Sequence, residues 1–550
     1  MTTAPLLSIE GLRLSGRNTT IVENLSFEIA HGEFLGVVGE SGSGKTMAAR
    51  AVIGLLPEGV RRDSGRILLD GEDLCAASTR RLRALRGPAM GMVFQEPMVS
   101  LNPAMTIGAQ LAEAIITHER PTDKELGGRI LDMLKRVRIP EPERALAAWP
   151  HEFSGGMRQR IMLASAMLLR PKLLIADEPT TALDTLNQQE VLDLMVELAR
   201  DDGAAVMLIT HNLGLVGRYA ERAIVMRRGE LVETGNAREL LLAPKRAYTQ
   251  ALVDALPRRG GRRAAPSAER PAIEARNVCV LYSGRGGLLG RKAERRAVDD
   301  VSLEVKAGEI VALVGGSGKT TLGRALLGLT PIDSGEIFVQ GVSRRAADRA
   351  MRRKAQLACQ LVFQDPHSSL DPRMRVSAAV GEPLRQARGL SRAERTRRVA
   401  EALDQVGLAD LGDRFPHALS GGQRQRVAIA RAIIAHPAFV VAAEPVSALD
   451  ATVQRQVIEL LRSLQRLYGF ACLFISHDLA VVDELADRVI VMETGRIVEE
   501  GPTDEVFDRP QHRYTRALLA ASATLRASVG GYQPRPGDKP RFSNVRLRAP

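Results

Sequence analysis

Two kinds of hydrophobic pattern alternate along this chain. Short runs in which every residue is apolar or β-branched are separated by longer stretches with the spacing of amphipathic helices. Because uninterrupted apolar runs suit strands that are buried on both faces of a parallel sheet, the alternation predicts an α/β fold. The clearest predicted strands are residues 34–38, 173–176 and 206–210 in the first half and residues 310–314, 439–442 and 472–476 in the second.

The second half of the chain repeats the motifs of the first. Ser154, Asp184 and Tyr248 recur as Ser420, Asp450 and Tyr514, each 266 positions later, which predicts two copies of one domain. Within the copies, residues 126–147 and 393–411 are predicted helical insertions. The predicted boundaries are residues 1–256 for the first domain, 257–271 for a basic Pro/Gly linker, 272–524 for the second domain and 525–550 for a basic tail.

The formal net charge is +12, and its distribution decides what it means. Residues 257–271 and 285–296 each carry +4 and residues 525–550 carry +5, so the rest of the chain is close to neutral. Charge that is confined to a tail and to Gly- and Pro-rich segments indicates solvated or phospholipid-facing residues. We therefore expect no nucleic acid as a partner.

Composition excludes several classes of protein. With 550 residues, of which 45% are hydrophobic, the chain can bury sizeable cores and is neither disordered nor fibrous. No uncharged apolar run approaches the roughly 18 residues that span a bilayer, and the first residues do not resemble a secretory signal. The four cysteines are too far apart for a zinc site, a clustered iron–sulfur ligand set or a disulfide framework. These features predict a cytoplasmic protein.

A glycine-rich loop follows the predicted strand 34–38 and opens a predicted helix. This context predicts a phosphate-binding loop, because its backbone N–H groups and the helix N-terminus converge on phosphate oxygens. Lys45 is predicted to reach the outer phosphates, and the Thr46 hydroxyl is predicted to bind Mg²⁺. The predicted residues of the loop are Gly39, Glu40, Ser41, Gly42, Ser43, Gly44, Lys45 and Thr46.

Further motifs follow the loop in a fixed order. Asp177 and Glu178 end the predicted strand 173–176, as expected for a carboxylate in the magnesium shell beside one that polarises water. Gln95 and residues 154–157 precede this pair, and Asp184 and His211 follow it. This order resembles the nucleotide-binding domain of the ABC transporter family. The resemblance covers both halves and nearly the whole chain.

The resemblance implies a P-loop NTPase fold in each half, with a mostly parallel sheet core, an antiparallel β subdomain and an inserted helical subdomain. It implies ATP hydrolysis with ATP and Mg²⁺ bound, each ATP lying between the phosphate loop of one half and the signature motif of the other. The implied catalytic and coupling residues are Gln95, Glu178, His211, Gln364, Glu444 and His477, with Thr46, Gln95 and Asp177 around Mg²⁺ and Asp184 and Asp450 in the D-loops. The implied signature residues are Ser154, Gly155, Gly156, Met157, Ser420, Gly421, Gly422 and Gln423.

Two further segments of each half resemble a particular subfamily. Residues 94–103 and 363–372, and the tails 244–252 and 510–518, resemble segments of peptide, nickel and glutathione importers. The resemblance implies a peripheral ATPase on the cytoplasmic face of a prokaryotic inner membrane. Its implied partners are two integral-membrane permease subunits and an extracytoplasmic solute-binding protein. Peptide is the default solute, while nickel, glutathione or an opine-like compound stay open.

The second phosphate loop is shorter than the first. Gly308 lies 276 positions after Gly32, but Lys319 lies only 274 after Lys45. Two missing residues shorten the reach of the loop by up to about 7 Å, and Leu313 stands where the pattern requires glycine, so we expect an incomplete phosphate cradle. The predicted ATP-binding residues of this loop are Gly315, Gly316, Ser317, Gly318, Lys319, Thr320 and Thr321.

The second half also has Ala443 where the first has Asp177, which removes an anionic partner for the metal. Its signature is complete with Gln423, whereas the first half has Met157. Head-to-tail pairing would place the intact loop opposite the complete signature. The sequence therefore predicts one hydrolytic site and one degenerate site.

The predicted adenine contact differs between the halves as well. The family places an aromatic residue on the first strand, and Tyr282 occupies that place in the second half, whereas the first half has Ser15 and Gly16. What stacks on adenine in the first half stays open.

Two other functions compete with import. A soluble tandem ATPase acting on ribosomes also lacks a pore, but such proteins carry a long charged helical linker, whereas the linker here is short and rich in Pro and Gly. The altered second half also suits a binding or regulatory module without turnover. Sedimentation with ribosomes would support the ribosome-acting ATPase, and an assay of phosphate release distinguishes a module without turnover from an importer ATPase.

Overall fold

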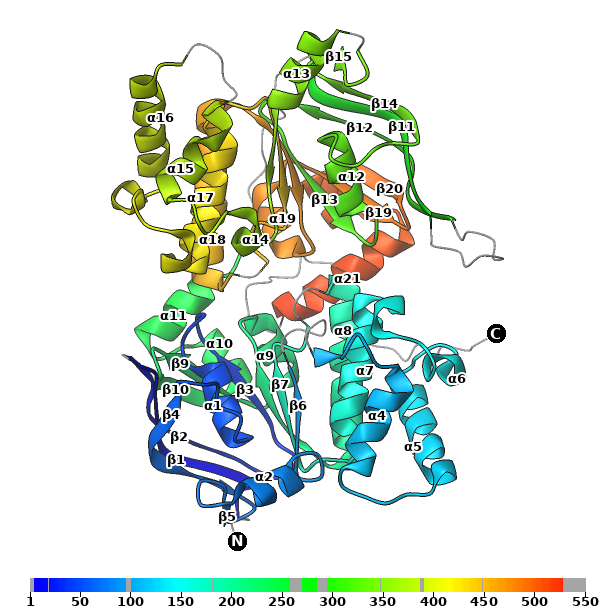
Figure 1. Cartoon of the computed structure of the whole chain (residues 1–550), viewed down its shortest axis with the longest axis vertical. Coiled ribbons are helices and arrows are strands. Elements are labelled where there is room, and N and C mark those ends of the chain that lie inside the picture. The colour runs from blue at the N-terminus through cyan, green and yellow to red at the C-terminus, as the bar shows by residue number, and fades with distance from the viewer. Residues whose placement is uncertain are drawn as a thin grey trace.

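The computed structural model describes residues 4–17, 19–94, 100–180, 183–257, 270–283, 294–346, 348–385, 390–447 and 449–527. The two halves of the chain lie one above the other in Figure 1, the N-terminal half below and the C-terminal half above. Each half contains a four-stranded sheet and a six-stranded sheet. The predicted α/β fold with two similar domains is confirmed.

The six-stranded sheet of the first half has the order β10-β9-β3-β8-β7-β6, in which only β9 and β10 pair antiparallel. The central strands are apolar and buried at almost every position. The four-stranded sheet, β2-β1-β4-β5, is antiparallel. The strands are β1 (Leu7–Ser15), β2 (Thr20–Ile29), β3 (Phe34–Val38), β4 (Arg61–Leu69), β5 (Glu72–Asp73), β6 (Met90–Val93), β7 (Leu173–Asp177), β8 (Ala205–Ile209), β9 (Arg222–Arg227) and β10 (Glu230–Asn236).

The helical insertion of the first half lies between β6 and β7 and starts before the predicted residue 126. Its apolar side chains form one core with the first residue of β3 and the apolar face of α8. The helices of this half are α1 (Lys45–Val52), α2 (Thr79–Leu85), α4 (Ile107–Ile116), α5 (Asp123–Arg136), α6 (Pro142–Ala145), a 3₁₀ turn (Pro150–Glu152), α7 (Gly155–Met167), α8 (Thr185–Asp202), α9 (Leu213–Tyr219), α10 (Ala237–Leu242) and α11 (Ala247–Asp254).

The second half repeats this plan, with the sheet orders β16-β17-β18-β13-β19-β20 and β12-β11-β14-β15. Its strands are β11 (Pro271–Ser283), β12 (Glu294–Lys306), β13 (Ile310–Gly315), β14 (Ser334–Val339), β15 (Val342–Ser343), β16 (Cys359–Val362), β17 (Phe439–Ala443), β18 (Ala471–Ile475), β19 (Arg488–Glu493) and β20 (Arg496–Pro502). Its α-helices are α12 (Lys319–Leu326), α13 (Arg349–Leu357), α14 (Pro366–Ser369), α15 (Val376–Gly381), α16 (Arg392–Gln405), α17 (Gly421–Ile433), α18 (Ala451–Tyr468), α19 (Leu479–Leu485), α20 (Thr503–Asp508) and α21 (Arg513–Ala527), and its 3₁₀ turns are Glu382–Arg385, Ala409–Leu411 and Pro416–Ala418.

The parallel pairing positions the chemistry. β3, β8 and β7 are neighbours that run in the same direction, so their carboxyl ends lie at one edge of the sheet. The glycine-rich loop leaves β3 at this edge, Asp177 ends β7 and Thr210 follows β8. The second half builds the same edge from β13, β17 and β18.

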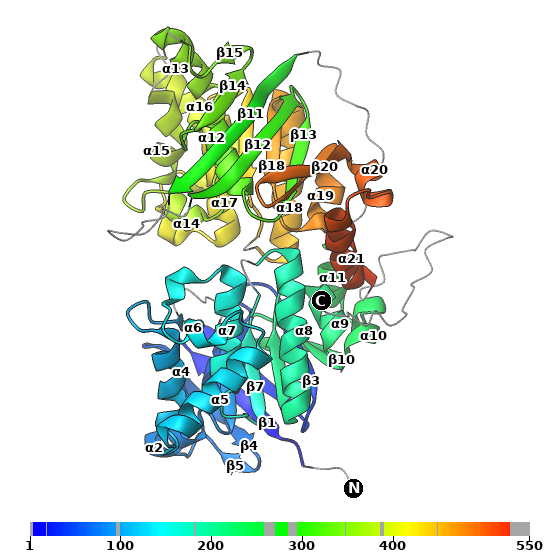
Figure 2. The same ribbon diagram turned by 90° about the vertical axis from the view of Figure 1, so that its right-hand side faces the viewer.

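The two halves contact each other through helices at their facing ends. Helix α21, the last described element of the second half, packs against α8 and α9 of the first. Figure 2 shows α21 reaching down beside the upper ends of these helices. In return, α11 of the first half packs against α18 of the second. The C-terminal helix of each half therefore lies on the other half.

Among the helices of the described residues, none combines the length and the apolarity needed to cross a bilayer. All four cysteines lie in this part of the chain, and none forms a disulfide.

Candidate functional site

The first phosphate loop wraps around the amine of Lys45. Nζ donates to the carbonyl oxygens of Gly39 and Glu40, both at 2.8 Å, and to Oγ of Ser43 at 3.2 Å. Burial lowers the pKa of Lys45, although the charges of Glu178 and Asp177 oppose the shift. Gly39 has a φ of +152°, and a Cβ there would lie 2.1 Å from the carbonyl oxygen of Met226, so only glycine fits.

A hydroxyl and a carboxylate meet at the end of this loop. Oγ1 of Thr46 donates to Oδ1 of Asp177 at 3.1 Å, which brings the start of α1 to the end of β7. Burial raises the pKa of Asp177, and the hydrogen bond from Thr46 opposes this shift. Mg²⁺ prefers hard oxygen ligands and is usually held by one or two carboxylates together with substrate phosphates. The pair therefore fits a magnesium ion that also binds the nucleotide.

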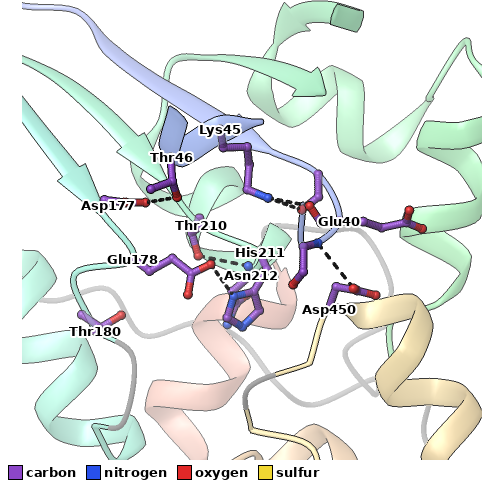
Figure 3. A network of polar contacts seen from close by, with 12 residues as sticks. Glu40, Lys45, Thr46, Asp177, Glu178, Thr180, Thr210, His211, Asn212 and Asp450 are labelled. Carbon is purple, nitrogen blue, oxygen red and sulfur yellow. Dashed lines mark hydrogen bonds and ion pairs between the residues drawn. The ribbon is translucent and has the colours of Figure 1, made fainter. Parts of the chain in front are cut away.

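A glutamate and a histidine lie beside this pair, as Figure 3 shows. Oε1 of Glu178 is 3.2 Å from Nδ1 of His211. Glu178 has a φ of +47°, and its N–H donates to the carbonyl of Ile209 at the end of β8. The strained backbone and the strand end thus fix the carboxylate next to the phosphate loop.

The second loop keeps both ends of the first but not its middle. Gly315 takes the place of Gly39, because a Cβ on Gly315 would lie 2.1 Å from the carbonyl of Met492. Gly318 precedes α12 in the left-handed conformation, as Gly44 precedes α1. Leu313, which stands where the pattern requires glycine, is buried within β13, and the strand ends at Gly315, so the missing residues lie after Gly315.

The two missing residues correspond to Ser41 and Gly42. The carbonyl of Ser43 accepts from the N–H of Gly229 at 3.0 Å, and the carbonyl of Ser317 accepts from the N–H of Gly495 at 3.2 Å. Because Gly229 and Gly495 are counterparts, Ser317 corresponds to Ser43. Lys319 still donates to the carbonyls of Gly315 and Gly316, at 2.5 and 3.0 Å, and burial lowers its pKa. Thr320, the counterpart of Thr46, is exposed, and Thr321 is half-buried.

The second half keeps only the glutamate of the carboxylate pair, and this glutamate lies in a hydrogen-bonded cluster. Oε2 of Glu444 accepts from Nε2 of Gln364 at 2.7 Å and lies 3.5 Å from Nδ1 of His477. Burial alone would raise the pKa of Glu444, but the hydrogen bond and charge of His477 lower it. Burial alone would lower the pKa of His477, but Glu444 raises it. Ala443 offers only a methyl group where Asp177 stands in the first half.

The signature motifs begin α7 and α17. Ser154 caps α7 through the N–H of Met157, and Ser420 caps α17 through the N–H of Gln423, both at 3.3 Å. Oε1 of Gln423 accepts in return from the N–H of Ser420 at 2.9 Å. Methionine has no such group, so the reciprocal cap exists only in the second signature. The glycines that follow are Gly155, Gly156, Gly421 and Gly422, and the second of each pair packs against the start of α8 or α18.

The D-loops cross from one half to the other. Oδ2 of Asp450 accepts from the N–H of Ser41 at 3.4 Å, while its Oδ1 caps α18. Asp184 caps α8, and its Oδ2 accepts from Nδ2 of Asn187 on the same helix at 2.7 Å. The residue that would correspond to Ser41 in the second loop is missing. The contact between D-loop carboxylate and phosphate loop therefore belongs to the first loop.

The second site has a different contact across the halves. Oγ1 of Thr185 donates to the backbone carbonyl of His477 at 2.6 Å. The counterpart of Thr185 is Ala451, which has no hydroxyl to offer His211. The asymmetry in the sequence thus extends to the interface.

Several predicted residues lie apart from these clusters. Gln95 lies outside the described residues. Tyr282 is 48% exposed near the end of β11, and its contact with adenine stays a prediction. The sequence did not identify Thr185, whose role depends on the pairing of the halves, and it identified Tyr248 only as part of a tail helix. Among the described residues, no group of three or more His, Cys, Asp or Glu side chains could hold a metal ion.

Comparisons with known proteins agree with the order of these motifs. Residues 22–181 and 298–447 match the family described as ABC transporter, and residues 232–284 and 498–546 match the oligopeptide/dipeptide transporter C-terminal region. The chain is 45% identical over 536 residues to the peptidoglycan transport ATP-binding protein YejF of Agrobacterium fabrum, covering 96% of this chain and 98% of that one.

The chain is also 43% identical to the glutathione import ATP-binding protein GsiA of Pectobacterium atrosepticum, covering 92% of this chain and 87% of that one. Among solved structures, cbiO1 of Clostridium perfringens is 28% identical and covers 44% of this chain and 92% of its own, with a TM-score of 0.39.

Proposed function

Because the chain belongs to the ABC transporter family, we propose that it is the ATPase subunit of a prokaryotic importer for peptides or a related small solute. The family makes the chain an ATPase. Two relatives are named for peptidoglycan transport and glutathione import, and both tails match the oligopeptide/dipeptide region, which supports a solute of this kind. The partners would be two membrane permease subunits and an extracytoplasmic solute-binding protein. The chain would bind at the cytoplasmic face of the inner membrane.

The first phosphate loop would carry the hydrolysis. Lys45 would leave the carbonyls that it now contacts and neutralise charge on the outer phosphates. Glu178, oriented by its backbone and beside His211, would hold the water that attacks the γ-phosphorus in line. The bond from γ-phosphorus to the bridging oxygen breaks, and ADP and phosphate leave. Mg²⁺, held by Thr46 and Asp177, would supply charge compensation for the phosphates.

The second site would be degenerate. Its loop lacks the counterparts of Ser41 and Gly42, and Ala443 supplies no carboxylate. The complete signature at Ser420 would close over the first loop, and the altered signature with Met157 over the second. The observation that carries this asymmetry is the D-loop contact of Asp450 with Ser41, whose donor the second loop lacks.

The test compares Lys45→Ala with Lys319→Ala in proteoliposomes that contain the membrane subunits co-purifying with the chain. Removing a group that stabilises transition-state charge lowers turnover by about a hundredfold or more, so we expect that loss for Lys45→Ala. For Lys319→Ala we expect less than about a threefold loss. Comparable losses from both would overturn the one-site proposal. Co-purification with ribosomes instead of membrane proteins would overturn the importer assignment.

The solute is tested in the same vesicles. We expect ATP-dependent uptake of a labelled tripeptide or of glutathione, abolished by Lys45→Ala. Uptake of nickel alone would replace the peptide assignment by a metal one.

A further inference from the structure

A tyrosine of the first tail helix contacts the first phosphate loop. The hydroxyl of Tyr248, in the second position of α11, accepts from the N–H of Glu40 at 3.2 Å. The guanidinium of Arg227 lies 4.6 Å from the centre of the tyrosine ring. Burial raises the pKa of Tyr248 to about 12, so the hydroxyl keeps its proton at physiological pH.

The same stretch of loop is also held by Lys45. Nζ of Lys45 donates to the carbonyl of Glu40, while Tyr248 accepts from the N–H of that residue. Both peptide groups that flank Glu40 are therefore fixed by side chains. The next residue, Ser41, is fixed by Asp450 of the other half. Because a phosphate cradle works only when successive N–H groups are oriented in advance, these contacts prepare the loop for a nucleotide.

The far end of α11 reaches the other half. Nη1 of Arg455 donates to the carbonyl of Asp254, the last residue of α11, at 2.7 Å. Arg455 lies in the second turn of α18, and Asp450 caps the start of that helix. The loop, Tyr248, α11, Arg455, α18 and Asp450 thus form a closed ring of contacts that crosses between the halves twice. Hereafter we refer to it as the α11–α18 ring.

The second half places its tyrosine similarly but closes the ring with apolar contacts. A Cβ built on Gly316 would lie 3.2 Å from the hydroxyl of Tyr514, so the tail tyrosine again lies at the second residue of the loop. Leu186, near the start of α8 in the first half, packs in one cluster with Tyr514 and Leu519. The counterpart of Ser41 is missing here, so this ring lacks the D-loop contact of the first.

We propose that Tyr248 is a positioning residue for ATP binding at the first phosphate loop, and that the α11–α18 ring couples this loop to the opposite half. The tail helix α11 would orient the loop, and the ring would transmit a change in the loop to the other half. The proposal rests on the first loop being the hydrolytic one, as proposed above. The occupant of the loop is ATP itself, so no further ligand is required.

The test measures ATPase kinetics and amide hydrogen exchange in the full chain. Tyr248→Phe removes only the hydroxyl, and Tyr219→Phe is the matched control, because its hydroxyl donates to Asp193 at 2.7 Å away from the loop. Losing one neutral hydrogen bond from a preorganised loop should raise KM for ATP about three- to tenfold. We expect kcat within about twofold of wild type and faster exchange in the peptide spanning residues 39–45.

A double variant tests the ring. Arg455→Ala should also raise KM, and combining it with Tyr248→Phe should give less than the product of the two separate effects, because both break the same ring. Independent effects that multiply would overturn the coupling. Unchanged KM and unchanged exchange in Tyr248→Phe would overturn the positioning role, and so would faster exchange with unchanged KM. In each of these cases, loss of ATPase activity in Lys45→Ala would still support hydrolysis at the first loop, so the failure of this proposal can be told apart from the failure of the proposed function. Hydrogen exchange still tests Tyr248 if Lys45→Ala proves active.

Discussion

Replacing Asp450 by asparagine separates two roles of one side chain. Oδ1 caps α18 through the N–H of Val453 at 3.0 Å, and Oδ2 accepts from the N–H of Ser41 in the other half at 3.4 Å. Because asparagine caps helices about as well as aspartate, Asp450→Asn keeps the cap. The variant loses the negative charge toward Ser41, and its amide nitrogen cannot accept from that N–H group.

The magnitude follows from the geometry of this contact. A hydrogen bond to a charged group contributes about 1.5–3 kcal/mol, and a separation of 3.4 Å places this one below that range. A loss of about 1 kcal/mol corresponds to about a fivefold lower kcat/KM for ATP. We expect this decrease in steady-state phosphate release, with an unchanged thermal midpoint of unfolding because the cap is retained.

Asp184→Asn is the matched control on the opposite side. Its Oδ2 is engaged by Asn187 on its own helix, and the loop that it faces lacks the counterpart of Ser41. We expect kcat/KM within about twofold of wild type. Equal losses in the two variants, or full activity of Asp450→Asn, would show that the D-loop contact does not distinguish the two sites.

Two further outcomes follow from the second half. The pair of His477 and Glu444 stabilises this half most between about pH 4.5 and 6.5. Its contribution is lost as the pH rises through the raised pKa of His477, and also as the pH falls through the lowered pKa of Glu444. The difference in thermal midpoint between wild type and His477→Gln should therefore be larger at about pH 5.5 than at about pH 8.5, and a constant difference would contradict the pairing. Gly315→Ala should prevent the second half from folding because its Cβ would lie 2.1 Å from the carbonyl of Met492. The control is Gly308→Ala, because Gly308 has a φ of +76° and open space around it, so this change should lower the free energy of unfolding by only about 1–2 kcal/mol. Equal losses of stability in the two variants, followed by circular dichroism, would refute the clash.

The parts of the fold that follow from local pattern could be predicted from the sequence. Residues 34–38 are a strand in the structure because an apolar run of that length can be buried on both faces. The helical insertion of the first half was predicted too short, because α4 lies before residue 126. The apolar side chains of α4 are buried by packing against α5 and α7, which the local pattern does not reveal. Here tertiary packing decides what the local pattern leaves ambiguous.

The site was predictable to the extent that its residues lie next to strand ends. Counting positions showed that the second loop is two residues short and that Leu313 stands where the pattern requires glycine, but it did not show which two residues of the loop are missing. Only the close approach to Met492 identifies Gly315 as the counterpart of Gly39. The contacts of Tyr248 with Glu40 and of Thr185 with His477 join residues more than 200 positions apart, so no local pattern could predict them.

The fusion of the two halves into one polypeptide has a consequence for assembly. If the halves were separate proteins with similar interfaces, each could also pair with a copy of itself. The resulting dimers would have either two full-length phosphate loops or two shortened ones. Covalent linkage, reinforced by the overlap of α21 on α8 and α9, favours one half of each kind in every particle. The shorter loop of the second half is therefore always accompanied by the longer loop of the first half, which lets the two halves diverge in sequence without forming mismatched pairs.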